Sequence, residues 1–187
     1  MAATPSTMLP LGTIAPNFHL LDVVNGEIKS LEQLKSPVGT IVMFICNHCP
    51  YVKHILPTLV GLIDEYQKKG ILTIAISSND VENYPEDSPE KMKQLAIELG
   101  NPFVYLYDET QEVAKLYQAA CTPDFYLFDG DLKCVYRGRF DGSTPKNNQP
   151  VTGSDLKKAL DALLLNNAII EEQLPSIGCN IKWKEGD

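Results

Sequence analysis

The stretch TIVMFICNHCP covers residues 40–50 and decides the fold class. Its first part, residues 40–45, is apolar and β-branched without alternation, which is typical of a central strand that is covered on both faces. Apolar side chains then recur at helical spacing through residues 51–69. A buried strand therefore leads directly into a helix, and Cys46 and Cys49 lie at the junction.

A second buried strand, residues 71–76, follows Gly70, a residue that suits the end of a helix. Two strands joined by a helix form a βαβ unit with a right-handed crossover, so we expect part of the sheet to be parallel. Pro57 lies inside the helix and is expected to kink it. The later pattern predicts helices over 88–99, 109–119 and 154–166 and a strand over 103–107.

Two segments have the pattern of β-hairpins. Residues 18–31 contain two strand-like runs around Asn25-Gly26, a dipeptide that suits a tight turn because both residues accept positive φ. Residues 124–137 repeat this arrangement around Gly130. Hairpin, βαβ unit, helix, strand and closing hairpin together predict a three-layer α/β sandwich.

Length and composition indicate one globular domain. The chain has 187 residues, of which 44% are hydrophobic and 21% are charged. We expect a single domain over residues 1–187, with residues 1–16 as an N-terminal arm and residues 167–187 as a C-terminal tail packed on the domain. A chain of this size forms a core without a disulfide framework or a structural metal.

Charge and cysteine content narrow the class of protein further. The formal net charge is -8, and the only arginines are Arg137 and Arg139, so nucleic-acid binding is disfavoured. The start lacks a basic stretch followed by an apolar run, and no segment stays apolar long enough to cross a bilayer. We therefore expect a cytoplasmic protein that binds no membrane. Five cysteines, only two of them close together, favour a redox or metal site in a reducing compartment.

The C-x-x-C motif at the start of a helix is suited to redox chemistry. Unpaired N–H groups and the helix dipole stabilise a thiolate there, and a protonated His48 would add to this effect. The short spacing lets one sulfur displace a partner bound to the other, which makes the pair a two-electron centre. The alternative is that Cys46 simply ends a strand and Cys49 caps a helix.

A C-x-x-C motif followed by Thr122-Pro123 before a strand resembles the thioredoxin superfamily. The blocks CNHCPYVKH, YPEDSPE, CTPDFYLFD and GCNIKWK resemble a peroxiredoxin-like branch that includes alkyl hydroperoxide reductase and thiol-specific antioxidant proteins. The resemblance spans about residues 11–184. It implies a thioredoxin-like α/β/α sandwich with a mixed central sheet. It also implies an exposed attacking thiol at Cys46, a resolving thiol at Cys49 and a cis-proline that orients the incoming chain at Pro123.

The sequence also departs from these families. Thioredoxin itself has Trp and a buried Asp where this chain has Ile45 and Thr40, so the sequence identifies no proton acceptor. Pro50 follows the motif and favours Cys49 as the N-cap of the helix. In the peroxiredoxin pattern Pro-x-x-x-Thr-x-x-Cys, aligned on Cys49, the Pro and Thr positions hold other residues. Dithiol exchange is therefore better supported than peroxide reduction.

The remaining cysteines and histidines leave alternatives open. Cys121 is either a third redox partner or a buried apolar side chain, and Cys179 either meets a distant thiol or packs in the structure. His54 together with Cys46, Cys49 and Cys121 could bind copper, zinc or an iron–sulfur cluster. The acidic loop 79–90 is interpreted as a solvated insertion.

The sequence thus predicts a thiol-disulfide oxidoreductase with a possible antioxidant role and with no metal or other cofactor. Its expected partners are protein or low-molecular-weight disulfides and an external thiol reductant. The alternatives are a peroxiredoxin-like peroxidase, a metal-binding protein with thiolate and His ligands, and a non-catalytic binding module. The predicted catalytic residues are Cys46, Cys49, Pro123, His48, Thr122 and Cys121.

Overall fold

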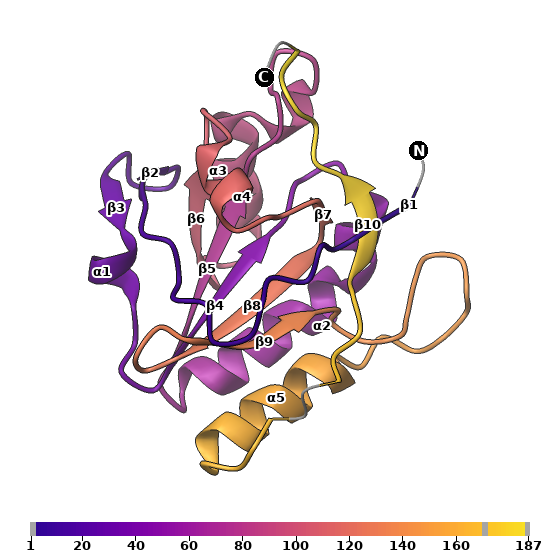
Figure 1. Cartoon of the computed structure of the whole chain (residues 1–187). Coiled ribbons are helices and arrows are strands. Elements are labelled where there is room, and N and C mark those ends of the chain that lie inside the picture. Colours follow the sequence, from indigo (N-terminus) through magenta and orange to yellow (C-terminus); the bar gives the residue numbers. More distant parts are fainter. Residues whose placement is uncertain (1–2, 170–171, 186–187) are drawn as a thin grey trace.

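A seven-stranded mixed sheet forms the centre of the computed structural model, which describes residues 3–169 and 172–185 (Figure 1). The strand order is β3-β2-β6-β5-β4-β8-β9. Strands β4, β5 and β6 are parallel to one another, whereas β8 runs antiparallel to β4 and β2 runs antiparallel to β6. The bounds are β2 (His19–Asp22), β3 (Ile28–Ser30), β4 (Gly39–Phe44), β5 (Ile71–Ser77), β6 (Val104–Tyr107), β8 (Asp124–Asp129) and β9 (Cys134–Gly138).

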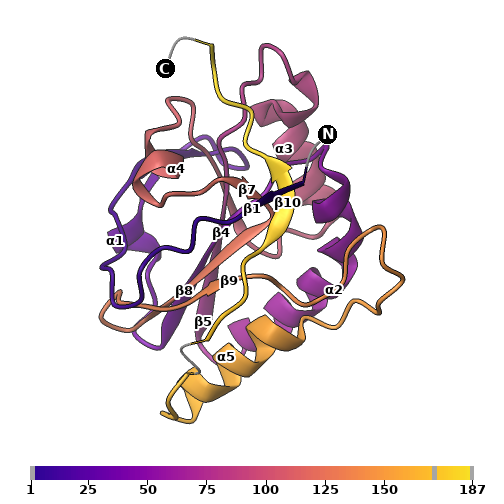
Figure 2. The ribbon, with the colours of Figure 1, turned by 45° about the vertical axis from the view of Figure 1, so that its right-hand side comes forward.

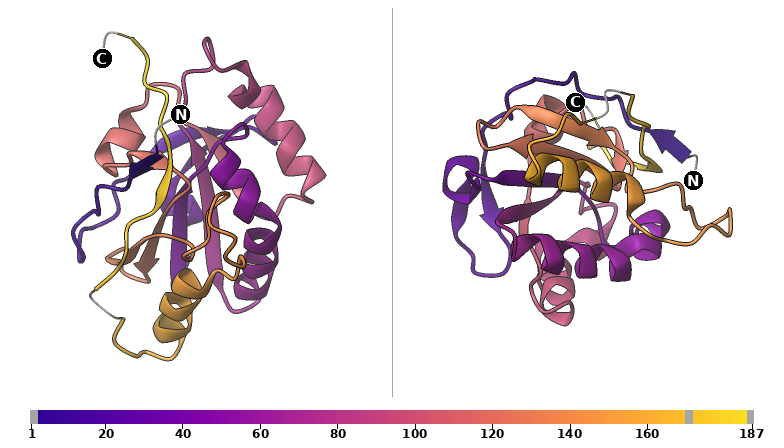
Figure 3. Two further views of the ribbon diagram at one scale, coloured as in Figure 1. Left: turned by 90° about the vertical axis from the view of Figure 1, so that its right-hand side faces the viewer. Right: turned by 90° about the horizontal axis from the view of Figure 1, so that it is seen from below.

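Helices cover both faces of the sheet, as the two turned views show (Figure 3). Along β4, Ile41 and Met43 belong to one core cluster and Val42 and Phe44 to another, so the strand is buried on both sides. This explains why its sequence shows no alternation. The first cluster includes α2 (Pro50–Gln67), α3 (Pro89–Glu98) and α5 (Ser154–Leu164), and the second includes α1 (Leu31–Leu34) and α4 (Glu112–Leu116).

The predicted three-layer α/β/α sandwich with a mixed sheet and an N-terminal hairpin is confirmed. The prediction of a tight turn at Asn25-Gly26 is wrong. The Asp22 N–H donates to the Glu27 carbonyl, and of the two turn residues only Gly26 has positive φ. The Asp22 carboxylate accepts from the Val24 N–H and stabilises the longer loop. Helix α2 continues through Pro57. No helix in the described part of the chain combines the length and apolar character that crossing a membrane requires.

A second, three-stranded sheet was not predicted from the sequence. Its order is β1-β10-β7, and both pairings are antiparallel (Figure 2). The strands are short and contain proline, glycine and asparagine, which gives them little strand character of their own. They form because they pair with one another: β1 (Ala3–Pro5), β10 (Ile177–Asn180) and β7 (Cys121–Thr122).

Gly178 allows β10 to approach β7 closely. A Cβ atom at this position would lie 2.0 Å from the Thr122 carbonyl oxygen and 3.2 Å from the Pro123 nitrogen. Both neighbours are backbone atoms, which cannot move aside as a flexible side chain can. Glycine at position 178 is therefore required for the strand to lie against the Thr122-Pro123 peptide.

The variant Gly178→Ala is expected to lower the free energy of unfolding by about 1–3 kcal/mol through this backbone clash. Gly61→Ala is the matched control, because a Cβ on Gly61 in α2 meets nothing within 4 Å. That control should raise the free energy of unfolding by about 0.5–1 kcal/mol. Urea unfolding of both variants measures the difference, and a Gly178→Ala midpoint equal to that of the wild type would contradict the close approach.

Candidate redox site

The two cysteines of the motif lie where β4 gives way to α2. Cys46 lies two residues after the end of the strand, and Cys49 is the N-cap of the helix, as Pro50 predicted. The Thr122-Pro123 peptide, between β7 and β8, is cis and lies next to both sulfur atoms. With His48, described below, the structure therefore brings together five of the six predicted site residues from distant parts of the chain.

The sulfur atoms make three close contacts. The Cys46 Sγ lies 3.4 Å from the Thr122 hydroxyl, and the Cys49 Sγ lies 3.2 Å from the Thr122 carbonyl oxygen. The third contact is between the Cys49 Sγ and the Cys179 Sγ, at 2.9 Å. All five cysteines are free thiols.

The expectation of an exposed Cys46 is wrong. Its side chain is 1% exposed, and that of Cys49 is fully buried. The reason is the second sheet, because β7 places Thr122 against both sulfurs and β10 places Cys179 against Cys49. The sequence pattern did not predict that sheet.

Hydrogen bonding assigns the negative charge of the reduced site to Cys49. The pKa of Cys49 is lowered to about 5, chiefly by a hydrogen bond from Cys46 and further by Cys179 and the Val52 N–H, although burial opposes the shift. The Val52 N–H is one of the unpaired donors in the first turn of α2. The same bond to Cys49 raises the pKa of Cys46 well above its ordinary value, and burial and the charge of Asp87 add to this. The pair therefore holds one thiolate and one thiol proton.

Asp87 organises the loop between the two cysteines. This fully buried carboxylate accepts hydrogen bonds from the backbone N–H groups of Asn47 and His48 at 2.8 and 3.1 Å. It also accepts from the His48 Nδ1 at 2.6 Å and from the Asn79 amide at 2.8 Å. Asp87 ends the short 3₁₀ helix η1 (Pro85–Asp87), so part of the loop interpreted as a solvated insertion supports the site. The block YPEDSPE contains this residue, but nothing in its pattern indicated the role.

His48 is held in place by Asp87 on one side and Tyr84 on the other. Its ring stacks on Tyr84 with centroids 5.4 Å apart and planes inclined by 12°. Its Nδ1 faces both the Asp87 carboxylate and the Cys46 Sγ, which is 4.0 Å away. A Cys-His-Asp hydrolase relay needs a different ring nitrogen for each partner, so this arrangement does not fit one. His48 instead places an N–H group near the Cys46 sulfur.

Cys121 does not share the contacts of the other site cysteines. Its Sγ lies 3.8 Å from the Pro123 carbonyl oxygen, and burial raises its pKa strongly. A role for Cys121 as a third redox partner stays a prediction. The additional thiol that contacts Cys49 is Cys179, for which the sequence left packing and thiol contact open.

The candidate metal ligands in the structure differ from those that the sequence predicted. Among the described residues, the set with ligand atoms close enough to share a metal ion is Cys46, His48 and Asp87, within 4.8 Å of one another. The predicted set included His54 instead of His48 and Asp87. The His48 Nδ1 and the Asp87 carboxylate already bond to each other, so a metal would have to displace that hydrogen bond. These residues fit a hydrogen-bonded thiol site better than a metal site.

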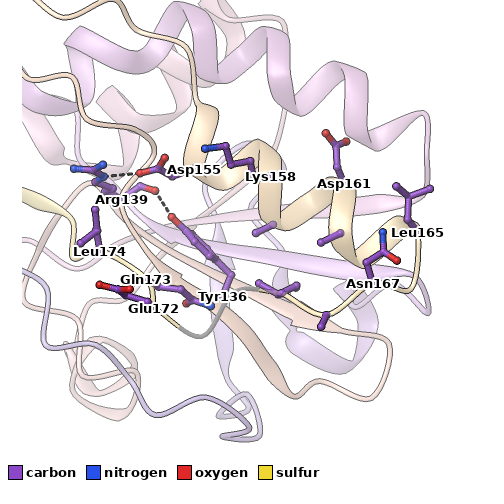
Figure 4. Close-up of a pocket in the computed structure, with 14 residues that line it drawn as sticks. Tyr136, Arg139, Asp155, Lys158, Asp161, Leu165, Asn167, Glu172, Gln173 and Leu174 are labelled. Atoms are coloured by element: carbon purple, nitrogen blue, oxygen red, sulfur yellow. Dashed lines mark hydrogen bonds and ion pairs between the residues drawn. The ribbon is translucent and has the colours of Figure 1, made fainter.

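Two cavities lie beside residues that neighbour the cysteines in the site. One of about 510 Å³ is lined by Asn47 and His48 together with Lys91, and one of about 180 Å³ is lined by Pro123 and Tyr51. A separate cavity of about 660 Å³ lies along α5 and has no cysteine in its lining (Figure 4). The two smaller cavities therefore border the C-x-x-C loop and the cis-proline, although neither has a cysteine in its lining.

The sequence profile of the AhpC/TSA family matches residues 11–137. The chain belongs to this family. A search of curated proteins found no match. Membership in this family supports a thioredoxin-like redox function and an oxidoreductase.

Solved structures of similar fold include close and distant relatives of this chain. An uncharacterized conserved protein from Geobacillus kaustophilus shares 59% sequence identity over 100% of this chain and 99% of its own, with a TM-score of 0.98. A hypothetical protein from Sinorhizobium meliloti 1021 shares 42% identity over 98% of this chain and 100% of its own, with a TM-score of 0.94. The thioredoxin domain of a thiol-disulfide oxidoreductase from Bacteroides vulgatus shares 18% identity over 82% of this chain and 99% of its own, with a TM-score of 0.62. This last likeness shows the thioredoxin-like fold.

We expect titration of the reduced protein to show one thiolate that forms with a midpoint near pH 5. The ultraviolet absorbance of the thiolate measures its formation. Below that midpoint Cys49 is a neutral thiol, so alkylation by iodoacetamide should slow as the pH falls. Cys49→Ser should remove the transition. Cys134→Ala, in which the changed residue lies in the other core cluster, should keep it. A transition that survives in Cys49→Ser would contradict the assignment of the charge.

Removing the charge of Asp87 should lower the pKa of Cys46, because that charge opposes ionisation of the thiol. Asp87→Asn keeps an oxygen that can accept from the backbone of the loop. We would measure the pH dependence of Cys46 alkylation in a Cys49→Ser background, with Asp80→Asn on the same loop as the control. An equal Cys46 pKa with and without the Asp87 carboxylate would contradict this electrostatic role.

Proposed function

We infer that this protein is a thiol-disulfide oxidoreductase in which Cys46 and Cys49 exchange two electrons with a substrate disulfide. The observation that carries the proposal is the geometry at the start of α2, where Cys46 and Cys49 both contact Thr122 beside the cis peptide of Pro123. The opposite shifts of the two thiol pKa values support it. A dithiol with one proton is both nucleophile and base. The family and the fold are consistent with this chemistry.

Cys46 is the attacking sulfur and Cys49 is its base. As a disulfide approaches, the Cys46 thiol gives its proton to the Cys49 thiolate, the group that raises the Cys46 pKa most. The Cys46 sulfur bonds to one substrate sulfur, and the other substrate sulfur leaves as a thiolate. The protonated Cys49 thiol can then donate to the Thr122 carbonyl oxygen 3.2 Å away.

Cys49 completes the exchange. Its proton passes to the leaving thiolate, and the restored Cys49 thiolate attacks the Cys46 sulfur of the mixed disulfide. The second half of the substrate leaves as a thiolate, and the Cys46–Cys49 disulfide remains. The substrate has gained two electrons and the protein has lost two. An external thiol, as a reducing compartment such as the cytoplasm provides, returns the site to the dithiol.

Neighbouring residues position these steps. Thr122 contacts Cys46 through its hydroxyl and Cys49 through its carbonyl, so one residue holds both sulfurs. His48, oriented by Asp87, faces the sulfur that attacks. Substrates are protein or low-molecular-weight disulfides. Because both sulfurs are buried, a small disulfide needs less movement of the surrounding chain than a protein does.

The positions of the two arginines favour disulfide exchange over peroxide reduction. The Arg137 guanidinium donates to the Leu9 carbonyl and to Gln173, and Arg139 donates to Asp155, as Figure 4 shows for the latter pair. Both side chains are thus bonded to groups outside the cysteine site. A peroxidase would instead use a positively charged group next to its thiolate.

Reduction of insulin disulfides with glutathione as the electron donor tests the proposal. Cys46→Ser and Cys49→Ser should both fall to the rate of glutathione alone, and Cys134→Ala should keep the wild-type rate. In Cys49→Ser a mixed disulfide should accumulate on Cys46, because the sulfur that displaces it is missing. Unchanged turnover in Cys46→Ser would overturn the mechanism. A mixed disulfide trapped on Cys49 in Cys46→Ser, with none on Cys46 in Cys49→Ser, would reverse the two roles.

A further inference from the structure

Cys179 lies within reach of a bond to Cys49. The two sulfurs are 2.9 Å apart, about 0.9 Å more than the ~2.05 Å of a disulfide bond. Both side chains are buried, so no solvent layer separates them. Cys49 also interacts with Cys46, which lowers the Cys49 pKa. The Cys49 sulfur is therefore influenced by two thiols, one from its own loop and one from β10.

The backbone fixes Cys179 in this position. Strand β10 pairs with β7 so that Cys179 is opposite Thr122, the residue that contacts both other sulfurs. Gly178 lies directly against the Thr122 carbonyl, and this close contact fixes the distance between β10 and β7. On the other side, the Lys182 N–H donates to Asn79, whose amide donates to Asp87. The strand is thus anchored on both sides of Cys179.

We propose that Cys179 is a third redox thiol, which accepts the disulfide of the C-x-x-C pair by bonding to Cys49. The proposal rests on the dithiol function above, because that function supplies the Cys46–Cys49 disulfide with which the step begins. The Cys179 thiolate attacks the Cys49 sulfur, the Cys46–Cys49 bond breaks, and Cys46 leaves as a thiolate that takes up the proton lost by Cys179. The Cys179 sulfur is oxidised and the Cys46 sulfur is reduced, so the step needs no external oxidant.

Oxidation of the pair itself removes an obstacle to this exchange. In the reduced site the pKa of Cys179 is raised to about 12, first by burial and then by Cys49, while Lys182 opposes the rise. Once Cys49 is part of a disulfide, its negative charge is gone and only burial keeps Cys179 protonated. Cys179 is therefore more reactive in the oxidised protein than in the reduced one.

The exchange would change what the site presents to its partners. A Cys49–Cys179 bond joins the start of α2 covalently to β10 and frees Cys46 as a thiol beside His48. The oxidising equivalent then lies between the central part of the fold and the second sheet, to which Cys179 belongs. Cys46 could meet a further disulfide while the first oxidation is still stored.

Disulfide mapping by mass spectrometry tests the proposal on the full-length protein. After oxidation with diamide, Cys46→Ser should contain a Cys49–Cys179 bond, Cys179→Ala should contain only Cys46–Cys49, and the wild type should contain both. Cys134→Ala is the control and should match the wild type. If Cys46→Ser is folded by circular dichroism but forms no Cys49–Cys179 bond, the proposal is overturned.

A second measurement uses glutathione buffers. The two disulfide forms contain the same number of electrons, so their ratio in the wild type should stay constant as the ratio of reduced to oxidised glutathione changes at fixed pH. A ratio that follows the buffer would overturn an internal exchange. The two proposals fail separately: wild-type insulin reduction without a Cys49–Cys179 bond removes only the role of Cys179. A Cys49–Cys179 bond without insulin reduction removes the oxidoreductase function and, with it, this step.

Discussion

The electrostatic interaction between Cys46 and Cys49 is the constraint on which the chemistry of this site depends. Burying a thiolate costs free energy unless donors surround it. Here the donors are the Cys46 thiol, the Cys179 thiol and the Val52 N–H in the first turn of α2. Only the last comes from the helix that the thiolate caps. The low pKa of Cys49 therefore belongs to the assembled site rather than to the C-x-x-C motif alone.

The architecture explains how donors from distant segments meet. The central sheet places the end of β4 and the start of α2 side by side, and its antiparallel neighbour β8 brings the cis-proline to the same edge. The second sheet then adds Cys179, 130 residues away from Cys49 in sequence. Asp87 fixes the intervening loop through two backbone N–H groups. Each part restricts the positions that the sulfurs can take.

Local patterns predicted most of the first sheet and half of the site. Residues 40–50 combine a strand, a cap and a helix start within one stretch, so Cys49 as N-cap followed from Pro50. The cis peptide at Pro123 followed from the resemblance to thioredoxins. These features depend on residues that are close in sequence or belong to a shared motif, which is why the sequence was enough.

The remaining features depend on contacts that no local pattern encodes. Asp87 lies in a polar loop, where a buried carboxylate has the same sequence appearance as a solvated one. The burial of Cys46 and the contact of Cys179 depend on β7 and β10, which are too short and too irregular to predict. The long-range pairing of these segments creates the strands, and the structure was needed to reveal it.

The order β1-β10-β7 makes β1 an outer brace for the strand that covers the sulfurs. Three residues near one end of the described chain thereby hold in place a strand near the other. If that brace detached, β10 would have an unpaired edge, and the cover over Cys49 would loosen without any change in the cysteines themselves. Access to the sulfurs of Cys46 and Cys49 is thus coupled to the pairing of a segment that lies more than forty residues from both cysteines in sequence.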